Sequence, residues 1–441
     1  MLSADHRRNF LFFASGVFLF LWATGLVLAE NTKPVLSIVP DRPDAIYHQG
    51  EPATFTIRLE ANGQPRDGVV RWIFLKNGSA EKIDGEISLK GGTATISGTL
   101  NEPGFLPVQV QCELDGKQLQ AESAVAFNPL EIKPSLPVPD DFDAFWNEKK
   151  KALAAIPVNA VLTPVESTSP RVEVFDVKAD CVGRPVSGFL ARPVGAKPKS
   201  LPGILTLHGT GVLSSDLGQS IHWAGQGLLA LDMNAHGLPN AQPNEFYTAL
   251  AEGELKDYGF QGSRSRETYY FLGMYLRLIR AIDILTSQPE WDGRTLIVHG
   301  DSQGGQQALA AAGLDTRVSM LVAGVPAMCD PTGVLAGRID GAFFVVSRNR
   351  AADGGVDREV VETLRYYSGA NFASRVKATA QFVVGFVDHS CPPTLVYSAY
   401  NTLPGKKAIF NGPTAGHAPT IESREAVQQT ILTHIKERRE N

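Results

Sequence analysis

The chain has 441 residues, a formal net charge of −5 and a charged fraction of 20%. Its hydrophobic fraction of 43% is that of an ordinary globular protein, and its length leaves room for two or three domains. No long run of one charge sign gives it the basic face that nucleic-acid binding requires, so we expect no nucleic-acid partner.

The first residues have the pattern of an export signal. The pair Arg7-Arg8 precedes an almost continuous apolar run, 10–28, and small residues up to Ala29 offer a cleavage site. The paired arginines also fit the twin-arginine export route. We expect residues 1–29 to be a cleaved signal peptide. The alternative is an uncleaved membrane anchor, because about 19 apolar residues can just span a bilayer. Either way, the rest of the chain is expected in the periplasm, at the cell surface or secreted.

The four cysteines do not have the spacing of a disulfide framework or a zinc site. Cys112, Cys181, Cys329 and Cys391 are far apart in the sequence, and none belongs to a CxxC motif. We therefore expect buried free thiols, with a single disulfide as the alternative, and no metal site.

Residues 34–128 read as short strands separated by turns. Polar and apolar residues alternate in 54–59, 69–75 follows as a second strand, and 104–114 with 118–127 reads as a hairpin. Strands at about ten-residue spacing predict an all-β, immunoglobulin-like sandwich. Because it shows no titratable cluster or aromatic platform, a structural or spacer role is favoured over carbohydrate binding.

A second domain is expected at 140–441, after a proline-rich linker at 129–139. It opens with a helix that has acidic residues in its first turn and apolar residues at Phe142, Phe145 and Trp146.

After residue 170, strand patterns alternate with helix patterns. Strands are expected at 204–207, 227–232, 295–299, 321–325 and 381–386, and helices at 269–286, 303–313 and 422–438. Such alternation predicts a mostly parallel sheet covered by helices on both faces.

The pentapeptide Gly300-Asp301-Ser302-Gln303-Gly304 fits the G-x-S-x-G nucleophile elbow. In that motif the serine occupies a sharp strand-to-helix turn, where larger neighbours would clash. Here the motif lies between an expected strand and an alanine-rich expected helix. Ser302 is therefore the predicted nucleophile, and a glycine-rich turn with a surface serine is the alternative.

The elbow requires an acid and then a histidine later in the chain. Asp388 ends an apolar strand, and His417 ends a loop of small residues before the last helix. A serine hydroxyl is a weak nucleophile, so His417 is expected to take its proton while an ionised Asp388 orients the imidazole.

Other histidines among the nine have weaker claims to that role. His434 lies inside the terminal helix and is predicted at the surface, and His299 is expected as a packed histidine on the strand before the elbow. His389 follows the acid and competes only if the strand register is misread. His208 is expected to support its loop.

Two backbone N–H groups are expected to form an oxyanion hole. One belongs to Gln303, directly after the nucleophile. The other is assigned to Thr210, in the loop His208-Gly209-Thr210-Gly211 that follows an early strand. Removing one such donor typically costs about 3 kcal/mol of transition-state stabilisation.

With these residues placed, the segment 136–437 resembles the acetyl xylan esterase and cephalosporin-C deacetylase family, carbohydrate esterase family seven. The resemblance implies an α/β-hydrolase fold, cleavage of acetyl esters on sugars such as xylo-oligosaccharides, no cofactor, and assembly into homo-oligomers. The matching motifs are Asp141-Phe142-Asp143-Ala144-Phe145-Trp146, Tyr269-Tyr270, Arg280-Ala281-Ile282-Asp283, residues 300–305, Asp315-Thr316-Arg317-Val318, Val325-Pro326-Ala327-Met328-Cys329-Asp330, Asp388, Cys391-Pro392-Pro393 and Gly416-His417.

Three departures limit what the resemblance implies. Thr210 stands where the family usually has an aromatic residue, which keeps the backbone donor but changes the pocket wall. The usual Asp-x-Arg-Gly-Gln motif is replaced by residues 232–237, without its arginine and glutamine, which puts the substrate-side loop and assembly in doubt. The N-terminal β-domain is additional to the simplest members.

Other functions remain open at this stage. A carboxylesterase or peptidase of the same fold would keep the triad and act on a non-sugar substrate. A glucuronoyl esterase would typically have an arginine after the nucleophile, and Gln303 argues against it. A catalytically inactive hydrolase acting as a cell-surface binding protein is disfavoured by the intact Ser302, Asp388 and His417.

Overall fold

The computed structural model describes residues 33–78 and 81–440. The expected export signal, residues 1–29, lies outside them. Within the described residues, no helix is long and apolar enough to cross a membrane.

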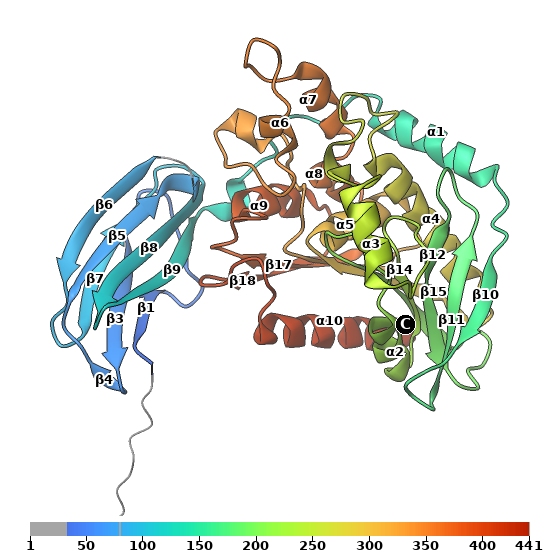
Figure 1. Ribbon diagram of the computed structural model, residues 1–441, viewed down its shortest axis with the longest axis horizontal. Helices are drawn as coiled ribbons and strands as arrows, with labels where there is room; N and C mark the ends of the chain where they lie inside the picture. The colour runs from blue at the N-terminus through green and yellow to red at the C-terminus, as the bar shows by residue number, and fades with distance from the viewer. Residues whose placement is uncertain (1–32, 79–80, 441) are drawn as a thin grey trace, which may run out of the picture.

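The N-terminal part of the chain forms two β-sheets, which make up a lobe beside the rest of the molecule (Figure 1). One sheet has the order β1-β3-β4, with β7 also pairing with β3, and the other has the order β2-β9-β8-β5-β6. All pairs are antiparallel except β2 with β9. The strands are β1 (Val35–Pro40), β2 (Ile46–Tyr47), β3 (Ala53–Ala61), β4 (Gln64–Pro65), β5 (Val69–Leu75), β6 (Lys82–Ser88), β7 (Thr93–Gly98), β8 (Gly104–Leu114) and β9 (Lys117–Phe127), and the short 3-10 helix η1 (Lys76–Gly78) follows β5.

The period-two sequence pattern explains how this lobe buries its core. In β3, Phe55, Ile57 and Leu59 are buried, while the residues between them are half-buried or exposed. The predicted strands at 54–59 and 69–75 lie in β3 and β5, and the predicted hairpin is β8 and β9.

The second part is built on a nine-stranded sheet of order β10-β11-β12-β14-β13-β15-β16-β17-β18. The pairs from β14 to β18 are parallel, as predicted, but β10, β11 and β12 add antiparallel pairs, so the sheet is mixed. These three strands were not predicted. The strands are β10 (Val161–Val165), β11 (Val172–Ala179), β12 (Val186–Pro193), β13 (Leu201–Leu207), β14 (Leu229–Met233), β15 (Trp291–Asp301), β16 (Met320–Gly324), β17 (Thr379–Gly385) and β18 (Lys407–Gly412).

Helices cover both faces of this sheet. On one face, Ile297 of β15 packs with Trp223 of α2 and Ile431 of α10, whereas the next residue, Val298, belongs to the core that includes Leu309 of α5. Continuous apolar strands are therefore buried on both sides. The helices are α1 (Phe142–Ala154), α2 (Leu217–Gly225), α3 (Asn244–Glu252), α4 (Phe271–Ser287), α5 (Gln303–Leu314), α6 (Val345–Arg348), α7 (Arg358–Arg365), α8 (Gly369–Ala373), α9 (Pro393–Thr402) and α10 (Ile421–Glu440), with 3-10 helices η2 (Pro129–Glu131), η3 (Tyr258–Phe260) and η4 (Gly333–Ala336).

The proline-rich segment 129–139 is packed against the second part of the chain. The Asn401 side chain of α9 donates to the carbonyl oxygens of Pro129 at 2.9 Å and Ile132 at 2.8 Å. The Ser135 hydroxyl donates to Asp330 at 2.6 Å. These contacts hold the segment against the second part of the chain, which it connects to the β-lobe.

Expectations about one histidine and about the four cysteines can be compared with the fold. The prediction that His434 lies at the surface is wrong: it lies on the buried face of α10, and its Nε2 lies 3.0 Å from the Ser319 hydroxyl. Burial lowers the pKa of this imidazole. The four cysteines are buried free thiols, as predicted.

Candidate active site

Ser302 occupies a strained turn between β15 and α5. Its φ of 58° and ψ of −121° are unusual for a residue with a side chain, and such strain persists only where surrounding contacts enforce it. The Ser302 N–H donates to Gly324 O at 2.9 Å, and its carbonyl accepts from Ala327 N at 3.0 Å. These bonds to the last residue of the neighbouring strand β16 and to the segment that follows it hold the turn in place.

Glycine is required on both sides of the turn because the backbones approach too closely for a side chain. A Cβ atom on Gly304 would lie 2.0 Å from Leu207 O, and one on Gly300 would lie 2.6 Å from the same oxygen. Asp301, which lies between Gly300 and Ser302, is exposed. The elbow predicted from residues 300–304 thus has a steric origin.

The structure brings Ser302, His417 and Asp388 together. His417 Nε2 lies 3.0 Å from Ser302 Oγ, and His417 Nδ1 lies 2.9 Å from Asp388 Oδ2. The other carboxylate oxygen, Oδ1, accepts the N–H groups of Ser390 and Cys391, each at 2.8 Å. The hydrogen bond to Asp388 raises the pKa of His417. This geometry suits proton transfer from the serine hydroxyl to the imidazole.

The expected oxyanion loop lies against the nucleophile. A Cβ atom on Gly209 would lie 3.9 Å from Ser302 Cβ, which places the His208–Gly211 loop beside the serine. Gln303 is the first residue of α5, and the first N–H groups of a helix have no acceptor within the helix. The Gln303 N–H is therefore directed out of the helix end, where the helix dipole also favours negative charge.

Two neutral histidines shape this loop. His208 Nε2 accepts the Ala235 N–H at 3.0 Å, so the proton must be on Nδ1, which donates to Gly209 O at 2.8 Å. His236 Nε2 donates to Gly211 O at 3.0 Å, and its Nδ1 accepts from the Tyr270 hydroxyl at 2.7 Å. Burial lowers the pKa of His208, and it lowers that of His236 to about 3. His208 thus has the loop-supporting position expected for it.

His236 belongs to the segment 232–237, which replaces the Asp-x-Arg-Gly-Gln motif. Asp232 accepts the Thr206 hydroxyl at 2.6 Å and the Asp216 N–H at 2.7 Å, and burial raises its pKa to about 7. Arg277 donates to Ala235 O at 2.8 Å. The segment is therefore anchored on both sides without the missing arginine and glutamine.

Sequence reasoning missed Tyr258. Its hydroxyl donates to the Gln303 side-chain oxygen at 2.5 Å, and its ring lies 4.6 Å from the His236 ring. Burial raises the pKa of Tyr258 to about 12, partly offset by hydrogen bonding with the Gly211 backbone and the Thr210 and Gln303 side chains. Tyr258 thereby contacts the side chains of the two residues whose N–H groups are the expected oxyanion donors. A single sequence gives no signal for this contact, because the loop before α4 has no motif that points to the elbow.

Cys391 is a second neighbour of the triad. Its sulfur and ligand atoms of Asp388 and His417 lie within 4.8 Å of one another. The carboxylate and imidazole are already hydrogen-bonded to each other, and burial raises the pKa of the Cys391 thiol well above its usual range. Because metals bind the thiolate, we assign no metal to this group.

Fold and site together define a class. A mixed sheet with a strained serine at a strand-to-helix turn, followed in chain order by an acid and a histidine, is the arrangement of the α/β-hydrolases.

Comparisons with known proteins identify the family within this class. The sequence model of the acetyl xylan esterase family (AXE1) matches residues 129–432, so the chain belongs to that family. It is 32% identical to the acetyl esterase Axe7A of Xylanibacter ruminicola over 405 residues, which are 90% of each protein. The protein is therefore a carboxylic ester hydrolase.

Solved structures agree with this assignment. An acetyl xylan esterase from Paenibacillus sp. R4 superposes with a TM-score of 0.62 at 29% identity, over 69% of this chain and 98% of that one. Acetyl xylan esterase 1 from Thermoanaerobacterium has a TM-score of 0.57 at 22% identity, over 69% of this chain and 97% of that one, and supports the fold.

Proposed function

We propose that the protein is a serine esterase that removes acetyl groups from acetylated sugars such as xylo-oligosaccharides. The observation that carries the proposal is the hydrogen-bonded series from Ser302 through His417 to Asp388, with distances of 3.0 Å and 2.9 Å. Membership of the acetyl xylan esterase family supports the choice of acetyl esters.

In the first half of the reaction, His417 Nε2 takes the proton of the Ser302 hydroxyl as Oγ attacks the acetyl carbonyl carbon. The carbonyl oxygen becomes an oxyanion, which the N–H groups of Gln303 and Thr210 stabilise. The carbon–oxygen bond to the sugar then breaks, and His417 returns the proton to the departing sugar hydroxyl. Acetate is left as an ester on Ser302.

In the second half, water replaces the sugar. His417 takes a proton from this water as it attacks the acyl carbon, the same two N–H groups stabilise the second oxyanion, and Ser302 leaves with its proton restored. Asp388 does not accept the proton: it fixes the imidazole tautomer and stabilises the imidazolium. No cofactor takes part in these steps.

We also propose a division of the chain into two domains. Residues 34–128 form an immunoglobulin-like sandwich domain, and the catalytic domain at 140–441 follows it after the proline-rich segment. Two sheets whose strand pairs are antiparallel, except for the short β2–β9 pair, support the first assignment. Export of the chain and its self-association remain predictions.

The proposal is tested by hydrolysis of 4-nitrophenyl esters of increasing acyl length, together with acetate release from acetylated xylo-oligosaccharides, with Ser302→Ala as the matched variant. We expect a preference for acetyl groups, deacetylation of the sugar, and loss of both activities in the variant. Serine-dependent activity only on longer or non-sugar esters would contradict the substrate class and keep the mechanism.

A second candidate function, a related carboxylesterase with a non-sugar substrate, is favoured by one observation. Thr210 replaces the aromatic residue usual after the His-Gly of the oxyanion loop, while Tyr258 packs nearby from another segment. The wall of the acyl pocket is therefore built differently, and the same two assays separate the two candidates.

A further inference from the structure

We propose that the N-terminal β-lobe positions the catalytic residues, because it contacts the two loops that carry Asp388 and His417. This inference rests on the proposed roles of those residues. It goes beyond them by giving the β-lobe a positioning role, in place of the spacer role expected from the sequence.

The first contact is with the segment 386–391, which follows β17, carries Asp388 and is called the acid loop below. Phe105 of β8 meets Phe386 edge-on, with ring centroids 4.9 Å apart, and Phe386 lies two residues before Asp388. Both phenylalanines are about 1% exposed. The Phe105 N–H donates to the Asn77 side chain at 2.8 Å, which fixes β8 at this point. Edge-to-face pairs of this kind contribute about 0.5–1.5 kcal/mol beyond the burial of their area.

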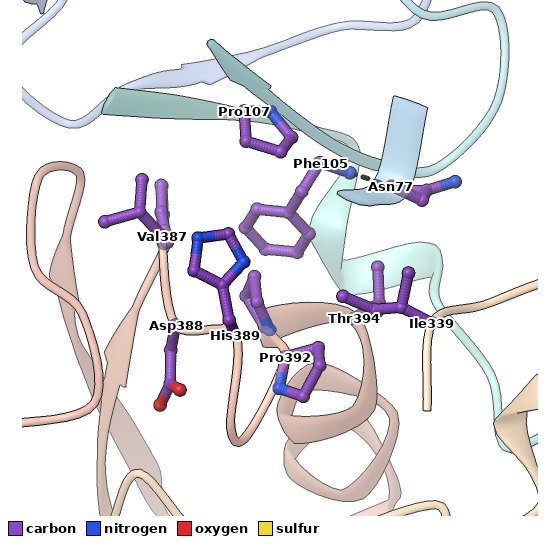
Figure 2. Close-up of a pocket in the computed structure, with 11 residues that line it drawn as sticks. Asn77, Phe105, Pro107, Ile339, Val387, Asp388, His389, Pro392 and Thr394 are labelled. Atoms are coloured by element: carbon purple, nitrogen blue, oxygen red, sulfur yellow. Dashed lines mark hydrogen bonds between the residues drawn. The ribbon is translucent and has the colours of Figure 1, made fainter. Parts of the chain in front are cut away.

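Figure 2 shows how the acid loop divides its side chains between the two parts of the protein. Val387 and His389 point toward Phe105 and Pro107 of the β-lobe, whereas the Asp388 carboxylate points away from the lobe. His389 Nε2 lies 3.1 Å from the carboxylate of Glu122 on β9. The acid is therefore flanked by two residues that contact the β-lobe.

The second loop is held by the same strand. The Ala124 N–H of β9 donates to Pro413 O at 2.9 Å, and the buried Ser123 hydroxyl lies 3.4 Å from the same oxygen. Pro413 directly follows β18 and begins the loop that carries His417 and leads to α10. One side of the β-lobe thus contacts both the acid loop and the loop 413–420 that carries His417, called the histidine loop below.

The two loops also contact each other, so they cannot shift independently. The Phe386 N–H donates to Gly412 O at 2.9 Å, and the Val387 N–H donates to Ala415 O at 3.2 Å. A Cβ atom on Gly385 would lie 2.3 Å from Gly416 O. A displacement of the acid loop would therefore move the histidine loop.

The interface is filled and is not itself a ligand site. The hollow between Phe105, Asn77 and the acid loop has a volume of about 20 Å³, which is room for about one water molecule. Close-packed surfaces of this kind transmit small displacements directly. A misplacement of about 1 Å can lower a rate about a hundredfold. Loss of these contacts should therefore lower the rate of the chemical step.

The test uses the full chain with Phe105→Leu and Glu122→Gln. The matched controls are Phe55→Leu, a buried phenylalanine that packs on Phe74 inside the β-lobe, and Glu86→Gln, in an exposed pair with Arg71. With 4-nitrophenyl acetate, we expect kcat to fall about tenfold or more in Phe105→Leu and about threefold in Glu122→Gln, with KM almost unchanged. The controls should keep the wild-type kcat.

A second readout separates this inference from the proposed function. The low-field proton resonance of His417 Nδ1–H, hydrogen-bonded to Asp388, should be sharp in the wild type and in Phe55→Leu, and shifted or broadened in Phe105→Leu. This signal reports positioning even if the wild type fails to hydrolyse esters, a result that would count against the proposed function alone. A wild-type kcat and resonance in Phe105→Leu, or equal losses in Phe55→Leu, would overturn the inference.

Discussion

Asp388 has both carboxylate oxygens engaged: Oδ2 lies 2.9 Å from His417 Nδ1, and Oδ1 accepts two N–H groups of its own loop. The loop holds the carboxylate so that both oxygens face the imidazole, Oδ2 at 2.9 Å and Oδ1 at 3.2 Å from His417 Nδ1. That arrangement accounts for the raised pKa of His417 and fixes Nε2 toward Ser302.

Asp388→Asn should retain the fold and lose most of the activity. The amide can present its NH₂ group to the imidazole and favour the wrong tautomer, so kcat for 4-nitrophenyl acetate should fall about ten-thousand-fold. The matched control is Asp353→Asn, an exposed residue whose bond from Gly355 N an asparagine oxygen can accept. An active Asp388→Asn enzyme would contradict the assignment of the acid.

The pH dependence of kcat/KM should follow the ionisation of His417. Only the neutral imidazole can accept the serine proton, and the hydrogen bond to Asp388 raises the pKa of His417 above the ordinary value of a histidine. Activity should therefore fall as the pH decreases through a midpoint above that value. In Asp388→Asn the midpoint of the residual activity should move to lower pH. An unchanged midpoint in Asp388→Asn would show that a group other than His417 controls the loss of activity at low pH. The control is His48→Gln, which should have the wild-type midpoint.

Tyr258→Phe should weaken oxyanion stabilisation without removing either backbone donor. The substitution deletes the 2.5 Å hydrogen bond to the Gln303 side chain and leaves the ring in place. We expect kcat to fall about tenfold, less than the cost of losing a donor outright, with KM little changed. Tyr247→Phe is the control, because its hydroxyl bonds Pro239 O away from the elbow. Equal effects in the two variants would indicate a purely structural role.

Gly304→Ala should disrupt the elbow by a backbone clash. Its Cβ would lie 2.0 Å from Leu207 O, which cannot move without breaking β13. We expect a loss of about 3 kcal/mol or more in the free energy of unfolding, measured with denaturant. The control is Gly225→Ala in α2, where an added Cβ meets nothing within 4 Å, and it should stabilise by up to about 1 kcal/mol. A stable, active Gly304→Ala protein would contradict the steric argument.

The sequence was informative where the pattern is local. The period-two segment 54–59 marked β3, and G-x-S-x-G marked the turn whose glycines the backbone of Leu207 requires. The chain order of Ser302, Asp388 and His417 was enough to predict three residues that the fold brings within hydrogen-bonding distance.

It was less informative where distant segments decide. The segment 186–193 is apolar in the middle of an antiparallel region and has no turn signal that reveals its partner β14. His434 lies in a polar helix, but it is buried and contacts Ser319, which directly precedes β16 and is distant in the sequence. The contacts of Tyr258 with Gln303 and of Phe105 with Phe386 join residues with no common motif.

The most direct test of the central claim is to trap the acyl-enzyme. Wild-type protein is mixed with 4-nitrophenyl acetate, quenched in acid during turnover, digested and analysed by mass spectrometry. The account predicts one acetyl group on the peptide at Ser302, absent from Ser302→Ala. Ester hydrolysis at the wild-type rate by Ser302→Ala, or an acetyl group on another residue in its place, would contradict it.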